Sequence, residues 1–250
     1  MLITLLTDFG TADGYVAEMK GVLVTAAPGV SVVDLSHDIT PHDVESARLA
    51  VARYWRRFPA GTVHLVVVDS GVGSARRAIA VASDGRFLVG PDNGVLSPAL
   101  LFPGAEVISV PVPTDAAPTF HGRDVFAPIA ATLVLGAKLS SLGSPHDDPV
   151  VRRTPEVHRE PDGTLRGEVI VVDRFGNAVT NVVAASASEV RVLDQVLPLR
   201  RTYADVGPGE PVALVGSSGL IEIAVREGSA AEVLGISRGT RVVVRTAAIT

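Results

Sequence analysis

The sequence contains no cysteine and few aromatic residues. Of its 250 residues, seven are Phe, three are Tyr and one is Trp. The absence of cysteine excludes disulfides, thiolate nucleophiles, Cys-ligated zinc, iron–sulfur clusters and thiol redox switching. Any chemistry must therefore come from carboxylates, His, Arg, Lys, hydroxyl groups and the backbone. The length is sufficient for a self-supporting hydrophobic core.

The chain also lacks basic clusters and long apolar runs. It carries 22 Lys and Arg against 27 Asp and Glu, a formal net charge of −5, and its basic residues never exceed two in succession, which argues against a nucleic-acid partner. The longest nearly apolar segment, residues 126–137, has about half the length of a membrane span. The first residues have no basic region of the signal-peptide type. We expect a soluble, cytoplasmic protein with no membrane partner.

The first half of the chain alternates apolar, β-prone runs with helical patterns. Residues 2–6, 31–35 and 62–68 predict strands buried on both faces, and residues 43–58 predict a helix that begins near Thr40 or His42. A tight turn at residues 83–86 predicts a hairpin. These patterns predict an α/β domain with a mixed, mostly parallel sheet.

A polar stretch, residues 140–166, separates this half from a different pattern. Short strands are then expected, broken by Gly, Pro, Asp and Ser and by one short helix near residues 229–234, which is typical of a small β-barrel or sandwich. The expected strands are residues 167–172, 189–193, 212–215, 220–225 and 241–245. We expect an α/β domain over residues 1–142, a linker over 143–164 and a β-rich domain over 165–250.

Polar residues follow the predicted strands of the first domain. Ligands bind beyond the carboxyl ends of the strands in an open α/β sheet, because loops and helix N-termini converge there. Asp8 and Asp13 lie after the first strand and suit ribose hydroxyls or a cation, although both also suit turns or caps. Asp69 follows the third strand, and a glycine-rich turn can fold Arg76 back onto it. The alternative for this pair is a surface ion pair of little energetic value.

Two other segments carry candidate side chains. In T-F-H-G-R-D-V-F-A-P, His121 suits chemistry near neutral pH, whereas Asp124 suits a helix N-cap. In V-D-R-F-G-N, Asp173, Phe175 and Asn177 lie on a turn, where Asn offers the donor and acceptor that an adenine edge requires, or simply supports the turn. The stretch S-H-D-I-T-P-H-D, residues 36–43, lacks the spacing of a metal site and suits a strand exit followed by a helix cap.

Seven ordered segments together resemble a known family. They are L-T-D-F-G-T-A-D-G-Y, S-H-D-I-T-P-H-D, V-V-D-S-G-V-G-S-A-R-R, G-P-D-N-G, F-H-G-R-D-V-F-A-P, V-D-R-F-G-N-A-V-T-N and G-S-S-G-L-I-E-I-A-V-R-E-G-S-A-A. This set resembles the S-adenosyl-L-methionine hydroxide adenosyltransferase family, which is related to fluorinases and chlorinases. The resemblance implies an N-terminal α/β domain, a C-terminal β-barrel, and a homotrimer that binds its ligand between domains of neighbouring subunits. The implied reaction is hydrolysis of S-adenosyl-L-methionine to adenosine and L-methionine, without a metal or other cofactor.

The resemblance also assigns roles to residues. It places a water-activating set on Asp69, Arg76 and His121. The implied substrate contacts are Asp8 for the ribose, Asp13 and Asp173 near the methionine portion, Asn177 for adenine, and Phe120, Phe175, Ser217 and Arg226 elsewhere around the ligand. The scarce aromatics Phe9, Phe120, Phe126 and Phe175 fall inside the matched segments, where they either wall a dry pocket or pack in the core.

Some positions distinguish this chain from its relatives. Where this chain has Asp69, the halogenating relatives carry a tyrosine, and where it has Gly122 they carry a serine that contacts the halide. Both differences favour water over halide as the nucleophile here. Ser70 stands where the hydrolase motif usually has proline. Ser218 stands where the halogenases use arginine against the methionine carboxylate, and Arg226 is a candidate substitute.

A sulfonium is already a good leaving group, so the chemical demand is an oxygen nucleophile held in line. We expect His121 to accept its proton while Asp69 orients the water and Arg76. A sensor that binds S-adenosylmethionine or adenosine without turnover, and a nucleoside halogenase, are the alternatives.

Overall fold

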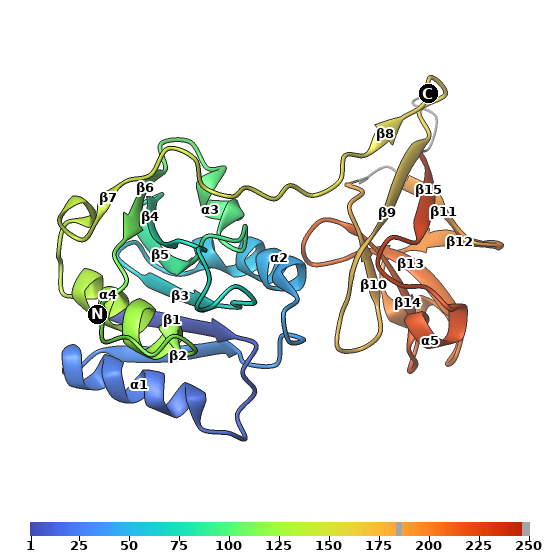
Figure 1. The fold of residues 1–250 in the computed structure, drawn as a ribbon. Helices are drawn as coiled ribbons and strands as arrows, with labels where there is room; N and C mark the ends of the chain where they lie inside the picture. The colour runs from blue at the N-terminus through green and yellow to red at the C-terminus, as the bar shows by residue number, and fades with distance from the viewer. Residues whose placement is uncertain (184–186, 247–250) are drawn as a thin grey trace. The chain divides into compact units, whose positions relative to one another are not determined.

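The computed structural model describes residues 1–183 and 187–246; residues 184–186 and 247–250 of the predicted β-rich domain lie outside the described residues. The chain divides into two compact units, Met1–Arg152 and Arg153–Thr250. Figure 1 shows a layered α/β unit and a β-rich unit, and each is considered by itself. No helix among the described residues is both long and apolar enough to cross a membrane.

The first unit, all of whose residues are described, is built on a seven-stranded mixed sheet in the order β2-β1-β3-β5-β4-β6-β7. Strands β2, β1, β3 and β5 pair in parallel, whereas β4 pairs antiparallel with both β5 and β6, and β7 pairs antiparallel with β6. The strands are β1 (Leu2–Thr7), β2 (Ser31–Ser36), β3 (Val63–Val67), β4 (Ala78–Ser83), β5 (Arg86–Pro91), β6 (Glu106–Val110) and β7 (Ser144–Pro145). This arrangement confirms the predicted mixed sheet and the hairpin at residues 83–86.

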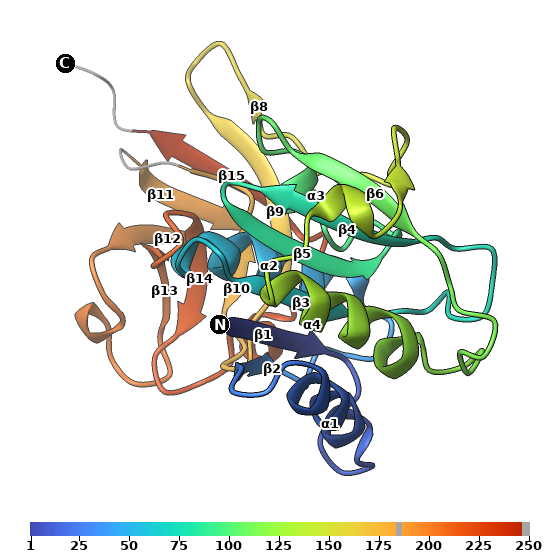
Figure 2. The ribbon, with the colours of Figure 1, turned by 90° about the vertical axis from the view of Figure 1, so that its left-hand side faces the viewer.

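Helices cover both faces of this sheet (Figures 1 and 2). The helices are α1 (Tyr15–Ala26), α2 (Val44–Tyr54), α3 (Ser97–Leu100) and α4 (Ala127–Val134). Helices α1 and α4 bury apolar side chains against one face, where the largest core cluster lies, and α2 and α3 contribute to the cluster on the other face. Burial on both faces explains why β1 and β3 read as nearly continuous apolar runs.

Two local predictions in this unit were wrong. Strand β2 is largely exposed rather than buried on both faces, because it forms the edge of the sheet; Val33 is 38% exposed. Helix α2 lies within the predicted helix over residues 43–58, but its N-cap is Asp43 rather than Thr40 or His42. The Asp43 carboxylate accepts the Ser46 backbone N–H at 3.0 Å. The helix gives way to a 3-10 turn at Trp55–Arg57 before Pro59.

The second unit is a closed β-barrel, as the resemblance implied. Over the described residues, its strands run in the order β10-β14-β13-β12-β11-β15-β9, pairing of β9 with β10 closes the ring of seven, and β8 pairs with β9 outside it. The strands are β8 (His158–Arg159), β9 (Leu165–Val172), β10 (Ala178–Thr180), β11 (Ala187–Val192), β12 (Gln195–Arg200), β13 (Pro211–Val215), β14 (Ile221–Val225) and β15 (Arg241–Thr246). One short helix, α5 (Ala230–Leu234), packs against the barrel core near β14. The sequence patterns missed β8 and β10, which have two and three residues, and β12, which contains Pro198.

His64 in the central strand β3 gives the first unit a pH-dependent stability. Its imidazole is fully buried between Tyr54 and Phe58, and Nδ1 lies 2.7 Å from the Thr4 hydroxyl. Burial is the main cause that lowers the pKa of His64 from 6.5 to about 4. The unfolded chain therefore takes up a proton between these two pH values that the folded chain does not. The free energy of unfolding should fall by about 3 kcal/mol through this group as the pH drops across that window.

His64→Gln removes this titration while keeping a polar partner for Thr4. Urea unfolding at a series of pH values should show a smaller acid-induced loss of stability for the variant than for the unmodified chain. Identical pH dependence of the two proteins would rule out His64 as the titrating group.

Candidate active site

The polar residues predicted after the strands meet at one edge of the first unit's sheet. Strands β1, β3 and β5 are parallel, so Asp8, Asp69 and Asp92, which follow them, lie at a common carboxyl edge. Arg76 reaches the same edge because it precedes β4, which runs antiparallel to β5. The topology therefore positions several charged side chains where ligands bind in open α/β sheets.

Asp69 and Arg76 form a buried, two-pronged ion pair. Arg76 Nε donates to Asp69 Oδ1 at 3.0 Å, and Arg76 Nη2 donates to Asp69 Oδ2. Their side chains are only 5% and 7% exposed, so the surface ion pair considered from sequence is wrong. Between them the chain turns through Gly73, at φ +75°, where a Cβ atom would approach the Pro118 carbonyl oxygen to 2.7 Å. Glycine at this position allows the turn to fold Arg76 back onto Asp69.

His121 completes the cluster from a different part of the chain. Its Nδ1 atom lies 3.2 Å from Arg76 Nη2, and the residue is 5% exposed. Because a guanidinium can only donate, Nδ1 must be the acceptor, and the neutral ring then carries its proton on Nε2. Burial, followed by the Arg76 charge, lowers the pKa of His121, with Asp69 and Asp124 opposing. His121 is therefore a neutral imidazole at neutral pH.

The charge of Asp69 is set by opposing influences. Burial raises the pKa of Asp69, and the Arg76 guanidinium, the Gly71 backbone N–H and His121 act to lower it. Together these influences raise the pKa of Asp69 above its ordinary value. Asp69 is thus a stronger base than an exposed carboxylate. Its two oxygens have four lone pairs and accept three N–H groups, two from Arg76 and one from Gly71, so one lone pair remains free.

The helix that follows His121 begins earlier than its sequence predicts. A π-helical turn, Gly122–Phe126, precedes α4, and His121 rather than Asp124 is its N-cap residue. Asp124 instead accepts the Ala117 backbone N–H at 2.9 Å and pairs with Arg123, so the predicted N-cap role was wrong. These contacts join the loop before His121 to the start of the helix.

Aromatic side chains lie beside this cluster. Phe9, Tyr15 and Phe120 make edge-to-face contacts with ring centroids 5.3 to 6.0 Å apart. A Cβ atom at Gly122 would lie 3.3 Å from Phe120 and 3.4 Å from Phe9, so glycine there allows these rings to approach closely. Phe126 is a core residue, 1% exposed, and Arg76 stacks over its ring at 5.3 Å.

The two aspartates of the first loop have different surroundings. Asp8 Oδ2 accepts the His42 backbone N–H at 2.8 Å, and His42 adopts φ +68°. His37 lies beneath this loop: its Nδ1 contacts the Thr7 hydroxyl at 2.9 Å, and its carbonyl accepts the Gly10 N–H. Asp13 is exposed in the same loop. The S-H-D-I-T-P-H-D segment thus supports the Asp8 loop, a role that strand and cap patterns did not indicate. Among the described residues, no three His, Asp or Glu side chains are grouped to hold a metal ion.

The candidates in the second unit lie in turns of the barrel. Asp173 Oδ1 accepts the N–H groups of Phe175 and Asn177, each at 2.9 Å, and Asp173 Oδ2 lies 3.3 Å from Asn177 Nδ2. This turn presents Phe175, which is 77% exposed. Ser217 is exposed in the turn between β13 and β14, and Arg226 donates to the Val206 carbonyl at 2.8 Å.

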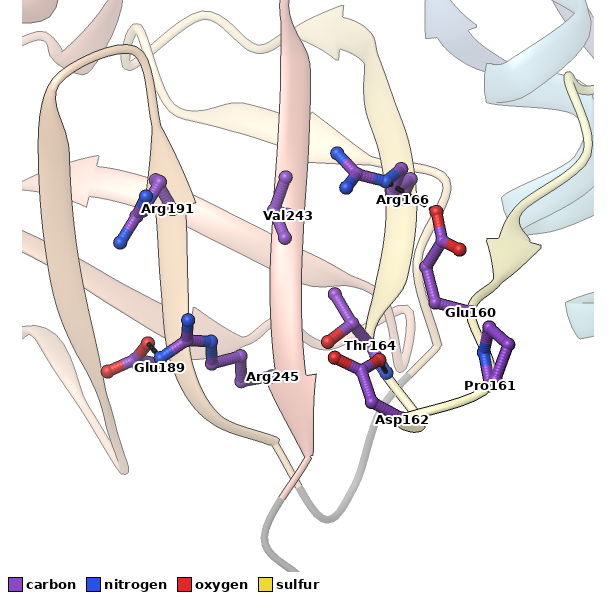
Figure 3. A pocket seen from close by; sticks show the side chains of 9 residues that line it. All are labelled: Glu160, Pro161, Asp162, Thr164, Arg166, Glu189, Arg191, Val243 and Arg245. Atoms are coloured by element: carbon purple, nitrogen blue, oxygen red, sulfur yellow. Dashed lines mark hydrogen bonds and ion pairs between the residues drawn. The ribbon is translucent and has the colours of Figure 1, made fainter.

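A separate concavity lies on the outside of the barrel. Arg191, Val243 and Arg166 stand in one row across β11, β15 and β9 (Figure 3). Acidic neighbours compensate part of this charge, since Glu160 pairs with Arg166 and Glu189 with Arg245. None of the predicted site residues lines it.

The two-unit architecture of this chain, an α/β sheet unit followed by a seven-stranded barrel, is similar to that of solved structures. An uncharacterized conserved protein from Thermotoga maritima superposes with a TM-score of 0.87 at 33% identity, covering 98% of this chain and 99% of that one. Family models match both units: the SAM hydroxide adenosyltransferase N-terminal domain over residues 3–143 and the C-terminal domain over residues 167–243.

Curated relatives agree with the family models. The (R)-S-adenosyl-L-methionine hydrolase of Thermus thermophilus is 44% identical, covering 94% of this chain and 95% of that protein. The fluorinase of Actinopolyspora mzabensis is 31% identical, covering 96% of each. The chain therefore belongs to the SAM hydroxide adenosyltransferase family, as its seven ordered segments predicted.

Proposed function

We propose that this chain is an enzyme that hydrolyses S-adenosyl-L-methionine to adenosine and L-methionine. The observation that carries the proposal is the buried Asp69–Arg76–His121 cluster, in a chain with 44% identity to an (R)-S-adenosyl-L-methionine hydrolase. A water oxygen attacks the ribose 5′-carbon while the carbon–sulfur electron pair returns to sulfur. The products are the adenosine 5′-hydroxyl, the methionine thioether and one proton.

The chemical demand falls on the nucleophile, because the sulfonium leaves as a neutral thioether. The site must orient one water molecule and accept its proton during attack. The Arg76 guanidinium bonds Asp69, His121 and the Arg77 carbonyl. Its positive charge is therefore fixed in place beside that water. A fixed charge in a buried site stabilises developing negative charge on oxygen without reorganisation.

The contacts support Asp69, rather than His121, as the proton acceptor. The single acceptor lone pair of neutral His121 faces Arg76, which leaves Nε2 as a donor toward the water oxygen. Asp69 keeps one free lone pair, and burial raises its pKa. This division of roles reverses the one expected from sequence.

The remaining predicted residues form the substrate contacts of the proposal. Asp8 would hold the ribose hydroxyls, Phe120 would bound the pocket, and Asp13 would lie near the methionine portion. The second unit would supply Asp173, Phe175, Asn177, Ser217 and Arg226. We further propose a homotrimer in which each ligand lies between neighbouring subunits. Dilution into separate subunits should then abolish turnover.

Incubation with S-adenosyl-L-methionine and chromatography for adenosine and methionine tests the proposal. The two sulfonium epimers are assayed separately, since the curated relative is named for the (R) epimer. Adenosine and methionine in equal amounts above the buffer control are expected. Binding without any product favours the sensor, and a halide-dependent 5′-halogenated nucleoside favours the halogenase.

A further inference from the structure

The G-P-D-N-G segment, residues 90–94, contacts the chain on both sides of the Asp69–Arg76 pair. It begins with the last two residues of β5, the neighbour of β3 in the sheet, and continues into the turn after that strand. Asn93 Nδ2 donates to the carbonyl of Val68, the residue directly before Asp69, at 2.8 Å, while Asn93 Oδ1 accepts the Val95 N–H at 3.1 Å. The side chain thus links the end of β3 to the turn after β5.

The neighbouring Asp92 holds the other half of the pair. Its backbone N–H donates to the Arg77 carbonyl at 2.9 Å, and that same carbonyl accepts Arg76 Nη1 at 2.9 Å. Residues 92 and 93 therefore contact both chain segments from which Asp69 and Arg76 project.

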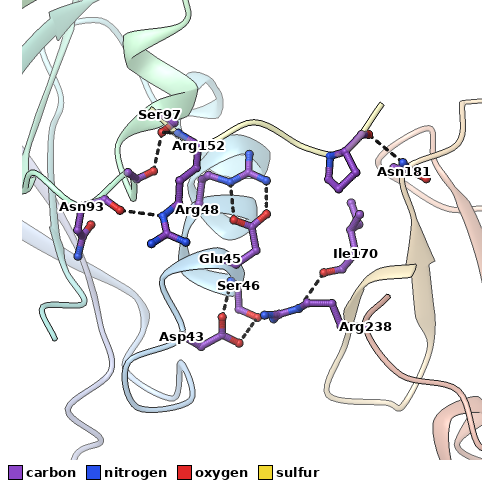
Figure 4. Close-up of polar contacts among 12 residues, drawn as sticks. Asp43, Glu45, Ser46, Arg48, Asn93, Ser97, Arg152, Ile170, Asn181 and Arg238 are labelled. Carbon is purple, nitrogen blue, oxygen red and sulfur yellow. Dashed lines mark hydrogen bonds and ion pairs between the residues drawn. The ribbon is translucent and has the colours of Figure 1, made fainter. Parts of the chain in front are cut away.

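The last residues of the first unit hold this segment in turn. The Asp92 carboxylate, 3% exposed, accepts the Val150 N–H at 2.7 Å and lies 3.1 Å from His146 Nε2. Arg152 donates through Nε to the Asn93 carbonyl at 2.9 Å, and through its backbone N–H to the Ser97 hydroxyl (Figure 4). The turn is thus fixed from the sheet side and from residues 146–152.

We propose that Asn93 and Asp92 are positioning residues for the Asp69–Arg76 pair, acting through the Val68 and Arg77 carbonyls. The inference rests on the proposed hydrolysis. Neither side chain has to touch substrate. By fixing two backbone carbonyls, they fix where the carboxylate and the guanidinium meet, and small displacements of a catalytic group cost large factors in rate.

Asn93→Asp is the sharpest test. It keeps the shape and the acceptor for Val95 but replaces the donor to Val68 by a second acceptor. We expect kcat to fall by about tenfold or more with little change in KM. Loosening of the pair also weakens the influence of Arg76 on Asp69, so the acid limb of the kcat–pH profile should move to higher pH. The charged or titratable groups that act on Asp69 are Arg76 and His121, and Asp124 acts on His121.

Asn181 provides a matched control in the barrel. Its side chain makes the same two kinds of bond, donating to the Pro155 carbonyl at 2.8 Å and accepting the Glu168 N–H at 2.8 Å. Asn181→Asp should lower stability without moving the acid limb. The proposal is overturned if Asn93→Asp keeps the unmodified kcat and acid limb, or if the two variants change both equally.

Two further measurements distinguish a variant that does not fold, and a chain that does not hydrolyse S-adenosyl-L-methionine, from a failure of the positioning proposal. Fluorescence of the buried Trp55 reports whether the first unit is folded. If Asn93→Asp does not fold, Asn93→Ala replaces it, because alanine removes the donor without adding charge. An unchanged kcat in Asn93→Ala overturns the proposal. If the unmodified chain makes no adenosine, the proposed function fails by itself. A crystal structure of the variant then decides the positioning role: a displaced Asp69–Arg76 pair supports it, and an intact pair overturns it.

Discussion

Replacement of Asp69 by asparagine is expected to lower kcat by at least about a hundredfold, the loss typical when a general base is removed. The amide has the shape of the carboxylate but cannot take up the proton of water. One of its two polar atoms would also be an NH2 group facing an Arg76 N–H, since both carboxylate oxygens accept from Arg76. Steady-state assay of adenosine release measures the loss, and adenosine binding by calorimetry checks that the site persists.

His121→Asn is the matched comparison for this experiment. The asparagine Oδ1 occupies nearly the place of the imidazole Nδ1 and can accept the same Arg76 N–H. A loss of about tenfold or less is expected, because the role assigned to His121 consists of hydrogen bonds to Arg76 and to the water oxygen and includes no proton uptake. If His121→Asn lost as much activity as Asp69→Asn, or more, His121 would be the base and the assignment would be wrong.

The unmodified chain should also lose turnover as the pH falls. Because the pKa of Asp69 is raised, this carboxylate is protonated closer to neutral pH than an ordinary one. A protonated Asp69 cannot take up the proton of the attacking water. Protonation of His121 on Nδ1 would break its contact with Arg76, which would also lower turnover at low pH.

Arg76→Met is expected to abolish turnover and to lower the free energy of unfolding by about 3 kcal/mol or more, the range for breaking a buried ion pair. Methionine fills similar space over Phe126 but leaves Asp69, whose side chain is 5% exposed, without its counter-charge. It also removes the donors to His121 and the Arg77 carbonyl. Urea unfolding and adenosine release measure the two effects on the same preparation.

Arg86→Met is the control for this substitution. Arg86 is also largely buried, with a side chain 13% exposed, and it bonds the Phe58 carbonyl and Asp84 away from the carboxyl edge of the sheet. The control should destabilise the unit yet leave kcat per folded molecule unchanged. Retention of more than about a tenth of the activity by Arg76→Met would contradict the role given to Arg76.

The sequence was most informative where burial or turn chemistry dictates residue type. Apolar runs marked β1 and β3 because both faces of these strands are covered, and Asp84-Gly85 marked the hairpin because both residues adopt positive φ. The edge position of β2 could not be read from its composition, since an edge strand of valines has the same apolar pattern as a central one. Strand β12 was missed because Pro198 interrupts the alternation.

Contacts between distant segments likewise limited what the sequence could predict about the site. Placement of Asp69 and Arg76 together followed from a strand end and a glycine-rich turn, but the bond between His121 and Arg76 spans 45 residues and depends on the tertiary fold. The roles of His37 and Asn93 were likewise invisible, because each acts on the backbone of another segment. The one available signal for both was a polar residue within two positions of the end of a strand.

Hydrolysis in water labelled with heavy oxygen tests the central claim most directly. Attack of water on the ribose 5′-carbon predicts that the labelled oxygen appears in the adenosine 5′-hydroxyl, that methionine stays unlabelled, and that Asp69→Asn forms neither product at a comparable rate. Mass spectrometry of the two products gives the answer. Unlabelled adenosine, or label in methionine, would contradict attack of water at that carbon.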